Sequence, residues 1–182
     1  MATKLYPIGM QTFSEIREED FLYVDKTEYI YRMTHTSGKY FFLSRPRRFG
    51  KSLLVSTMQS YFEGKKELFK GLAIDKLEKE WKQYPVFHLS FGGQNFVEPY
   101  ALDKVLEEFV AMAERIYGRE ELAETLGSRF KAVLGNAHKK TGMRAVVLID
   151  EYDKPLLDVM DMDISVQNEY GKMTLEDYNR NL

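Results

Sequence analysis

The chain has 182 residues, 44% of them hydrophobic and 30% charged, and its formal net charge at pH 7 is −2. This balance is typical of a folded globular protein and excludes an intrinsically disordered one. It also excludes a global basic field for nucleic acid, so any such contact must be local. The absence of cysteine excludes a disulfide scaffold, thiol catalysis and cysteine-ligated zinc. No apolar run approaches the ~18 residues of a membrane span, and no signal-peptide core begins the chain, so we expect a cytoplasmic protein.

The first 38 residues predict a short helical and extended segment. Thr12 can cap a first helical turn, and residues 21–24 form an extended piece. Asp25 caps a helix that runs over about 26–35. We expect this segment to pack against the domain that follows.

Residues 40–63 organise the rest of the chain. An aromatic and aliphatic run at 40–43 predicts a strand, a basic turn follows it, and Gly50-Lys51-Ser52 begins an amphipathic helix that ends near residue 62. This is the order strand, phosphate loop, helix. The N-terminus of such a helix offers unpaired N–H groups and a partial positive charge, which suit a phosphate.

Three residues of this loop have separate expected roles. Gly50 lets the backbone approach a phosphate, Lys51 reaches the β- and γ-phosphates, and the Ser52 hydroxyl ligates Mg²⁺. The match to the pattern G-x-x-x-x-G-K-[ST] is imperfect, because the first glycine position holds Arg45. The alternative interpretation is an ordinary basic turn before a helix.

Arg45, Arg47 and Arg48 form a local basic cluster in this loop. One interpretation is that these side chains only keep the protein soluble. The other is that they add positive charge around a triphosphate and compensate for the missing glycine. The sequence leaves both open.

The remaining elements follow from apolar periodicity and turn residues. Predicted helices cover about 75–83, 101–117 and 119–138, a last helix begins near residue 174, and a second strand covers 86–91. The stretch after Pro155 is acidic and polar and predicts a loop.

The apolar run at 145–149 ends in Asp150 and Glu151. An all-apolar run predicts a strand buried on both faces, as in a parallel sheet. Acids at its carboxyl end would lie in the crevice where open α/β sheets bind ligands. Asp150 would then hold Mg²⁺ opposite Ser52, and Glu151 would polarise the attacking water. The alternative is a strand that ends in two solvated acids.

A metal-dependent nuclease centre of the form D…(D/E)-x-K is a rival interpretation of these acids. The position two residues before Lys154 is Tyr152, which is not an acid, and Glu151 lies one residue too far from Lys154. The spacing therefore argues against a nuclease centre here.

Several motifs together resemble the predicted AAA-ATPase-like family of bacterial P-loop ATPases. They are Tyr6-Pro-Ile-Gly9 with Phe13 and Ile16-Arg17, Tyr23-Val-Asp-Lys-Thr27, Ser44-Arg-Pro-Arg-Arg-Phe-Gly-Lys-Ser52, Tyr61-Phe-Glu-Gly64, Leu68-Phe-Lys-Gly-Leu72 and Leu148-Ile-Asp-Glu-Tyr-Asp-Lys-Pro155. The resemblance covers nearly the whole chain. It implies that an arginine at the first glycine position is this family's own form of the loop.

The resemblance also implies parts that this chain lacks. Family members continue with a strand that carries a sensor residue, an arginine-bearing region and often a restriction-endonuclease-like domain. The resemblance places the chain in the additional-strand, catalytic-glutamate division of P-loop ATPases. In this division the sensor strand lies between the phosphate-loop strand and the Walker B strand, so we expect strands 40–44 and 145–149 to leave a gap. We therefore expect a fragment of a longer protein, which by itself binds nucleotide weakly and hydrolyses it poorly.

The predicted fold is an α/β P-loop NTPase with a parallel sheet flanked by helices, incomplete at its C-terminus. Residues 1–38 would pack on a partial ATPase core at 39–182. Glu151 and Lys51 would be catalytic, and Ser52 and Asp150 would hold Mg²⁺. ATP would contact the loop residues, which are Arg45, Arg47, Arg48, Phe49, Gly50, Lys51, Ser52 and Leu53.

The predicted function is Mg²⁺-dependent ATP binding, with hydrolysis when the domain is complete. A non-hydrolysing nucleotide switch or interaction module is the leading alternative, and phosphoryl transfer to a small substrate is a third. A nucleic-acid or protein partner would act through the absent C-terminal domain, and no membrane partner is expected.

Overall fold

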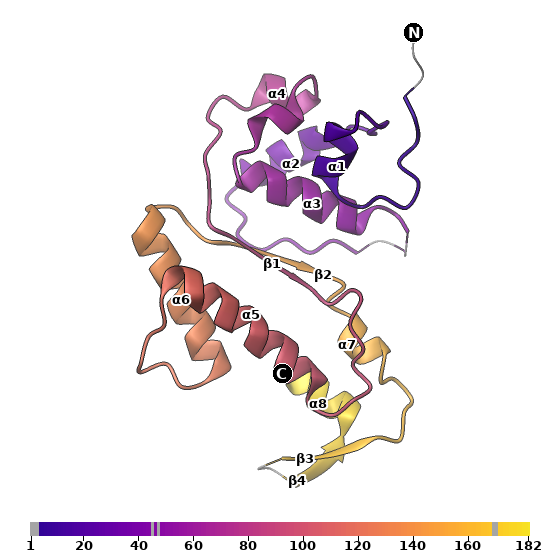
Figure 1. Cartoon of the computed structure of the whole chain (residues 1–182), viewed down its shortest axis with the longest axis vertical. Coiled ribbons are helices and arrows are strands. Elements are labelled where there is room, and N and C mark those ends of the chain that lie inside the picture. The colour runs from indigo at the N-terminus through magenta and orange to yellow at the C-terminus, as the bar shows by residue number, and fades with distance from the viewer. Residues whose placement is uncertain (1–3, 45, 47, 169–170) are drawn as a thin grey trace. The chain divides into compact units, whose positions relative to one another are not determined.

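The computed structural model describes residues 4–44, 46, 48–168 and 171–182. The chain forms two compact units, unit 1 over residues 1–86 and unit 2 over residues 87–182. Unit 1 contains α1 (Phe13–Glu18), α2 (Thr27–Thr34), α3 (Lys51–Phe62), the 3-10 helix η1 (Lys66–Phe69) and α4 (Ala73–Leu77) (Figure 1). From residue 86 onward the chain forms β1 (Val86–Ser90), α5 (Ala101–Tyr117), α6 (Leu126–Thr141), β2 (Val146–Asp150), α7 (Lys154–Leu157), β3 (Ser165–Asn168), β4 (Gly171–Thr174) and α8 (Leu175–Asn181).

Unit 1 has a hydrophobic core of its own. Apolar residues at helical spacing place α1 against α3 and α2 against α4. Phe13 on α1 and Phe69 on η1 are fully buried, and their ring centroids lie 4.8 Å apart. The other buried members of this core are Ile30, Tyr61, Leu72 and Ile74. Helices from both sides of the loop at 36–50 therefore share one core.

Asp25 joins the N-termini of α2 and α4. Its Oδ1 accepts hydrogen bonds from the N–H (2.8 Å) and the hydroxyl (2.7 Å) of Thr27, and its Oδ2 accepts one from the N–H of Ala73 (2.6 Å). The Thr27 hydroxyl oxygen in turn accepts from the N–H of Ile74 (3.1 Å). These bonds satisfy N–H groups that helix starts leave unpaired, so the predicted capping role of Asp25 is confirmed.

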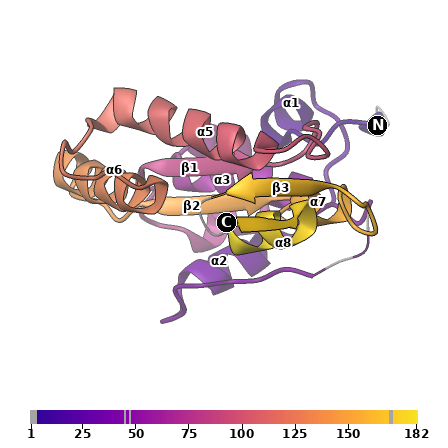
Figure 2. The same ribbon diagram turned by 90° about the horizontal axis from the view of Figure 1, so that it is seen from below.

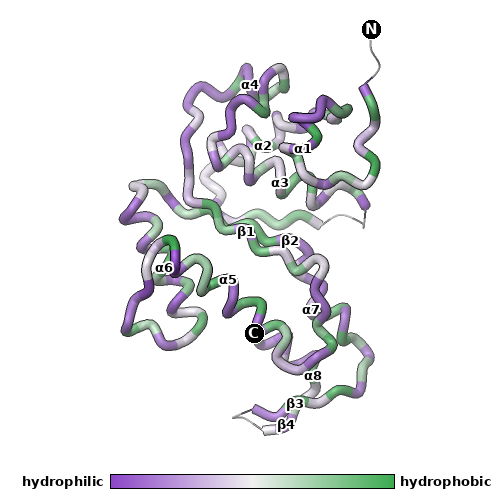
Figure 3. Tube along the Cα trace, viewed as in Figure 1, coloured by the Kyte–Doolittle hydropathy of each residue, from purple (hydrophilic) through white to green (hydrophobic). Residues whose placement is uncertain are grey.

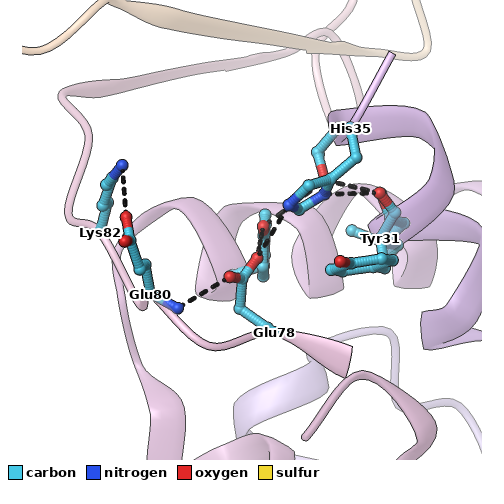
Figure 4. Close-up of polar contacts among 8 residues, drawn as sticks. Tyr31, His35, Glu78, Glu80 and Lys82 are labelled. Carbon is cyan, nitrogen blue, oxygen red and sulfur yellow. Dashed lines mark hydrogen bonds and ion pairs between the residues drawn. The ribbon is translucent and has the colours of Figure 1, made fainter. Parts of the chain in front are cut away.

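A buried carboxylate fixes the chain where α4 ends. Glu78 is only 8% exposed, and its Oε2 accepts a hydrogen bond from the Tyr61 hydroxyl while its Oε1 accepts one from the N–H of Glu80 (3.0 Å). The Nε2 of His35, at the end of α2, lies 3.8 Å from Oε2 of Glu78, and Figure 4 shows these side chains together with Tyr31, on which the His35 ring stacks. Glu78 therefore brings together α2, α3 and the segment after α4.

Unit 2 contains a two-stranded parallel sheet. β1 and β2 are hydrogen-bonded neighbours, and the N–H of Phe91, directly after β1, donates to the carbonyl of Asp150 at the end of β2 (3.1 Å). Because the carboxyl ends of the two strands meet, the strands run in the same direction. Along both strands Figure 3 shows mainly hydrophobic colouring.

Helices α5 and α6 pack against each other in unit 2. Their shared core contains Phe87, Ala113, Val133 and Ala137. Arg129 on α6 is 7% exposed and donates from Nε and Nη2 to the two carboxylate oxygens of Glu114 on α5, both at 2.9 Å. A two-pronged, buried ion pair therefore links the two helices.

The last part of unit 2 is a hairpin with a helix. β3 and β4 are antiparallel, with Val166 opposite Met173, and Val166 packs in a small core with Val159 and Leu175. Figure 2 shows the hairpin beside α8, where the side chain of Thr174 caps the helix by accepting from the N–H of Asp177 (3.1 Å). The predicted last helix is confirmed, but the loop predicted after Pro155 is wrong, because this stretch forms α7 and then β3 of the hairpin.

Helices α3 and α5 have the bounds that the sequence predicts, and β1 and β2 agree with the predicted strands to within a residue at each end. The helix predicted over 75–83 ends at Leu77, because Glu78 has an extended backbone (ψ 123) and its carboxylate is bound elsewhere. The helix predicted over 119–138 begins only at Leu126, because the Thr125 side chain caps it there by accepting from the N–H of Ser128.

Two predictions about strands are wrong for the described structure. Residues 40–43 form no strand, and Tyr40 and Phe42 are 94% and 72% exposed. β2 is buried on one face only, since Leu148 is 6% exposed whereas Val147 and Ile149 are 38% and 49% exposed. Both differences have one physical reason: a strand needs hydrogen-bonded neighbours and covering layers, and the described sheet has two strands.

Candidate functional site

The predicted phosphate loop ends in a left-handed turn directly before α3. Gly50 precedes the helix with φ 71° and ψ 29°, and Arg48 also has a positive φ of 66°. Hydrogen bonding of the helix begins with the N–H of Leu54 and the carbonyl of Gly50 (3.1 Å). The N–H groups of Lys51, Ser52 and Leu53 precede this first bond, so they are the donors that a helix N-terminus offers to an anion.

The side chains of this loop are accessible. Arg48, Phe49 and Gly50 are exposed, and Lys51 and Ser52 are half-buried. Among the described residues no ion pair engages Lys51 or Arg48. Arg45 and Arg47, the other predicted nucleotide contacts, lie outside the described residues. The described part of the loop therefore combines free backbone donors with two uncommitted positive charges.

Asp150 and Glu151 lie at the carboxyl end of β2, as predicted. Asp150 is 8% exposed, and its Oδ1 accepts a hydrogen bond from the N–H of Glu151 (3.0 Å). Glu151 is exposed and has a positive φ of 53°, a conformation that costs a residue with a side chain free energy and that is frequent at functional sites. The two acids thus differ in environment: one is held in the sheet, and the other projects from a strained turn.

Lys154, the lysine of the rival nuclease pattern, has a structural partner. Its Nζ lies 2.8 Å and 2.7 Å from the two carboxylate oxygens of Asp158, which directly follows α7. Oδ2 of Asp158 also accepts from the N–H of Phe96 (3.3 Å). Within the described ranges, no group of at least three histidine, aspartate or glutamate side chains is arranged to hold a metal ion. Lys154 and Asp158 connect α7 to the loop after β1.

A family model described as Predicted AAA-ATPase matches residues 7–180. The chain belongs to this family. The AAA-ATPase-like resemblance that the motifs predicted is therefore confirmed.

This AAA-ATPase-like chain is also 40% identical, over 159 residues, to an uncharacterized protein in the vnfD 5′ region of Azotobacter chroococcum mcd 1. The alignment covers 87% of this chain and 31% of that protein, so the chain spans less than a third of the relative's length. No solved structure matches the chain. None of the described helices has both the length and the apolar character needed to cross a membrane.

The predicted site residues that the structure describes fall into two groups. The structure places Gly50, Lys51, Ser52 and Leu53 on one helix start in unit 1, and Asp150 with Glu151 at one strand end in unit 2. The two groups belong to different compact units. Sequence reasoning missed the backbone strain at Glu151. It also missed that the Glu151 carboxylate lies against Gly92, two residues after β1.

Proposed function

We propose that the chain is the phosphate-binding part of an ATPase. The observation that carries this proposal is the start of α3, where a left-handed Gly50 is followed by Lys51 and by three N–H groups that precede the first hydrogen bond of the helix. A helix N-terminus favours an anion through its free donors and its partial positive charge. The match to the Predicted AAA-ATPase family supports a nucleoside triphosphate as that anion.

The proposed binding roles follow from side-chain chemistry. Lys51 contacts the β- and γ-phosphates, and the backbone from Gly50 to Leu53 surrounds them. Phe49 and the basic residues of the loop, Arg45, Arg47 and Arg48, would contact the nucleotide. Mg²⁺ would bind the Ser52 hydroxyl directly, and Asp150 would hold it directly or through water, since hydroxyl, carboxylate and water oxygens are the ligands Mg²⁺ prefers.

The proposed catalytic residue is Glu151. Its carboxylate would accept the proton of the attacking water as the water approaches the γ-phosphorus, and Lys51 would stabilise negative charge on the phosphate oxygens. Buried Asp150 is suited to binding the metal, and exposed Glu151 is suited to activating the attacking water. This difference in burial supports the assignment of the two roles.

We further propose that turnover by residues 1–182 alone is slow. Among the described residues β2 pairs with β1 alone, and residues 40–43 form no strand. A sensor strand, which the family resemblance implies, would extend the sheet. The greater length of the Azotobacter relative leaves room for such a strand and for a further domain that engages a protein or nucleic acid.

Binding is tested with a fluorescent ATP analogue and Mg²⁺, titrated into the wild-type chain and into a Lys51→Ala variant. A hydrogen bond to a charged partner is worth about 1.5–3 kcal/mol, so we expect Lys51→Ala to weaken binding by about 10- to 100-fold. Lys139→Ala is the matched control, because Lys139 is an exposed lysine on α6. Equal affinity of the wild type and Lys51→Ala would contradict the proposed site.

A non-hydrolysing nucleotide switch is the second candidate, and the two-stranded described sheet favours it. The two candidates differ in their response to Glu151→Gln. If the chain is an ATPase, this variant keeps its affinity for ATP and loses the slow single-turnover hydrolysis of the wild type. If the chain is a switch, the wild type and the variant show the same background hydrolysis and the same affinity.

A further inference from the structure

The carboxylate of Glu151 lies where a side chain at position 92 would otherwise be. Gly92 follows β1, and a β-carbon on it would be 3.1 Å from Oε2 and 3.3 Å from Cδ of Glu151. These separations are shorter than an ordinary van der Waals contact of about 3.5–4.0 Å. Any residue other than glycine at this position must therefore displace the carboxylate.

Ser90 contributes to the same small space. Its hydroxyl oxygen accepts a hydrogen bond from the N–H of Gly92 (3.2 Å) and would lie 3.3 Å from the same β-carbon. The hydroxyl and the Glu151 carboxylate thus flank one point at the end of β1. The loop after β1 is also held further along, where the N–H of Phe96 donates to Asp158.

The main chain of Glu151 is held on both sides. Its N–H donates to Oδ1 of Asp150 (3.0 Å), and its carbonyl accepts from the N–H of Lys154 (3.0 Å). A group added at position 92 would therefore be accommodated by the Glu151 side chain and not by its backbone. The missing side chain at Gly92 therefore leaves room for the carboxylate in this position.

We propose that Gly92 is a positioning residue for Glu151. Its missing side chain lets the carboxylate lie against the end of β1, where it can orient water. This inference rests on the proposed role of Glu151 in hydrolysis. A general base acts only within about 2.6–3.2 Å of the proton donor's heavy atom, so a displacement of a few tenths of an ångström reduces its effect. A displacement of about 1 Å can cost on the order of a hundredfold in rate.

Gly92→Ala tests the inference without straining the backbone. The φ of Gly92 lies outside the left-handed region, so alanine can adopt the native conformation. Gly93→Ala is the matched control: Gly93 has φ 74° and a β-carbon there would meet no atom within 4 Å, so this variant strains the same loop without touching Glu151.

The measurement is single-turnover hydrolysis at saturating Mg²⁺-ATP, together with nucleotide affinity, for the full chain. We expect Gly92→Ala to lower the hydrolysis rate by about threefold to tenfold, because the displacement is a few tenths of an ångström, while affinity stays within about twofold. Gly93→Ala should lower the hydrolysis rate much less. In a Glu151→Gln background Gly92→Ala should have no further effect on rate, because the group that it displaces is no longer a base.

Two results would overturn the inference, and they are distinguishable. If the wild type hydrolyses ATP faster than Glu151→Gln, but Gly92→Ala keeps the wild-type rate or Gly93→Ala loses as much, Gly92 does not position the base. If the wild type is no faster than Glu151→Gln, the proposed hydrolytic function fails, and the role of Gly92 fails with it.

Discussion

The hydroxyl of Tyr61 on α3 donates a 2.5 Å hydrogen bond to Oε2 of Glu78, directly after α4. Burial, and then the bond to Glu78, raises the pKa of Tyr61 well above its ordinary range. The hydroxyl therefore stays protonated and remains a donor throughout the neutral range. This bond ties the helix of the proposed phosphate loop to the segment that leads into β1.

Removing the Tyr61 hydroxyl should destabilise unit 1. Tyr61→Phe keeps the ring and leaves the buried Glu78 carboxylate without one donor, so we expect a loss of about 1–3 kcal/mol in the free energy of unfolding. The single tryptophan, Trp81, lies 5.7 Å from the Tyr61 ring, so its fluorescence can follow urea unfolding of this unit. Tyr29→Phe, at a 68% exposed position on α2, is the control and should stay close to the wild type. A similar stability of the two variants would contradict this role.

Asp25 should make the stability of unit 1 depend on acid pH. Burial raises the pKa of Asp25, but the hydrogen bonds from Thr27 and Ala73 outweigh it, so the pKa lies below the ordinary value of 3.8. A carboxyl whose pKa is lower in the folded state stabilises that state fully above its unfolded pKa, and the contribution is lost as the pH falls through the folded pKa. The expected window therefore begins near pH 4 and extends downward.

Asp25→Ala should cost about 1 kcal/mol or more near neutral pH, because it removes the acceptor at two helix starts. The difference between the variant and the wild type in the free energy of unfolding should stay constant between about pH 5 and 7 and shrink below about pH 4. Urea unfolding at a series of pH values measures it. Asp163→Ala, at an exposed position, should show no such trend, and a pH-independent difference for Asp25→Ala would contradict the prediction.

The pair Arg129–Glu114 should respond differently to single and double replacement. The hydrogen bonds from Arg129 lower the pKa of Glu114, and both residues are less than 10% exposed. Arg129→Met leaves the buried Glu114 carboxylate with only Arg119 nearby, at 4.0 Å, so this variant should cost about 3–5 kcal/mol. Glu114→Met should cost less, because Arg129 keeps its ion pair with Glu107.

Replacing both partners by methionine should recover much of the loss, because no unpaired charge then remains. Far-UV circular dichroism during urea unfolding reports on α5 and α6. If the double variant is as unstable as the sum of the single variants, the two side chains do not act as a pair.

Elements that depend on local apolar spacing could be predicted from the sequence, whereas features that depend on contacts between distant residues could not. α5 could be predicted to the residue because its apolar spacing is local and continuous. The end of α4 could not, because it depends on Glu78 and its bond to Tyr61, a residue 17 positions away. The β3–β4 hairpin was missed because the short alternation around Val166 stands in an acidic stretch whose composition predicts a loop.

The candidate site likewise has some features that the sequence indicated and others that arise from packing. Residue types and their order indicated Gly50, Lys51 and Ser52 at a helix start and acids at a strand end, and the structure places them there. The positive φ of Glu151 and its contact with Gly92 arise from the packing of two strand ends that lie about 60 residues apart in the chain, which no local pattern encodes. The exposed run at 40–43 shows that apolar character alone does not make a strand.

Gly50→Ala tests the contribution of the loop backbone to nucleotide binding separately from that of the loop side chains. Gly50 has φ 71°, and a β-carbon there would meet no atom within 4 Å, so the cost is strain of about 1–2 kcal/mol in the left-handed conformation. Relief of this strain rotates the N–H groups that precede the first bond of α3. We therefore expect Gly50→Ala to weaken binding of the fluorescent ATP analogue by about tenfold or more.

Gly64→Ala is the control for this change, because Gly64 has φ 72° just after the other end of α3. It carries the same backbone strain on the same helix and should reduce stability to a similar extent. Its affinity for nucleotide, however, should remain within about twofold of the wild type, since the donors at the start of α3 keep their orientation. Equal loss of affinity in both variants would show that nucleotide binding follows the general stability of unit 1, and the assignment of the phosphate site to the start of α3 would then be wrong.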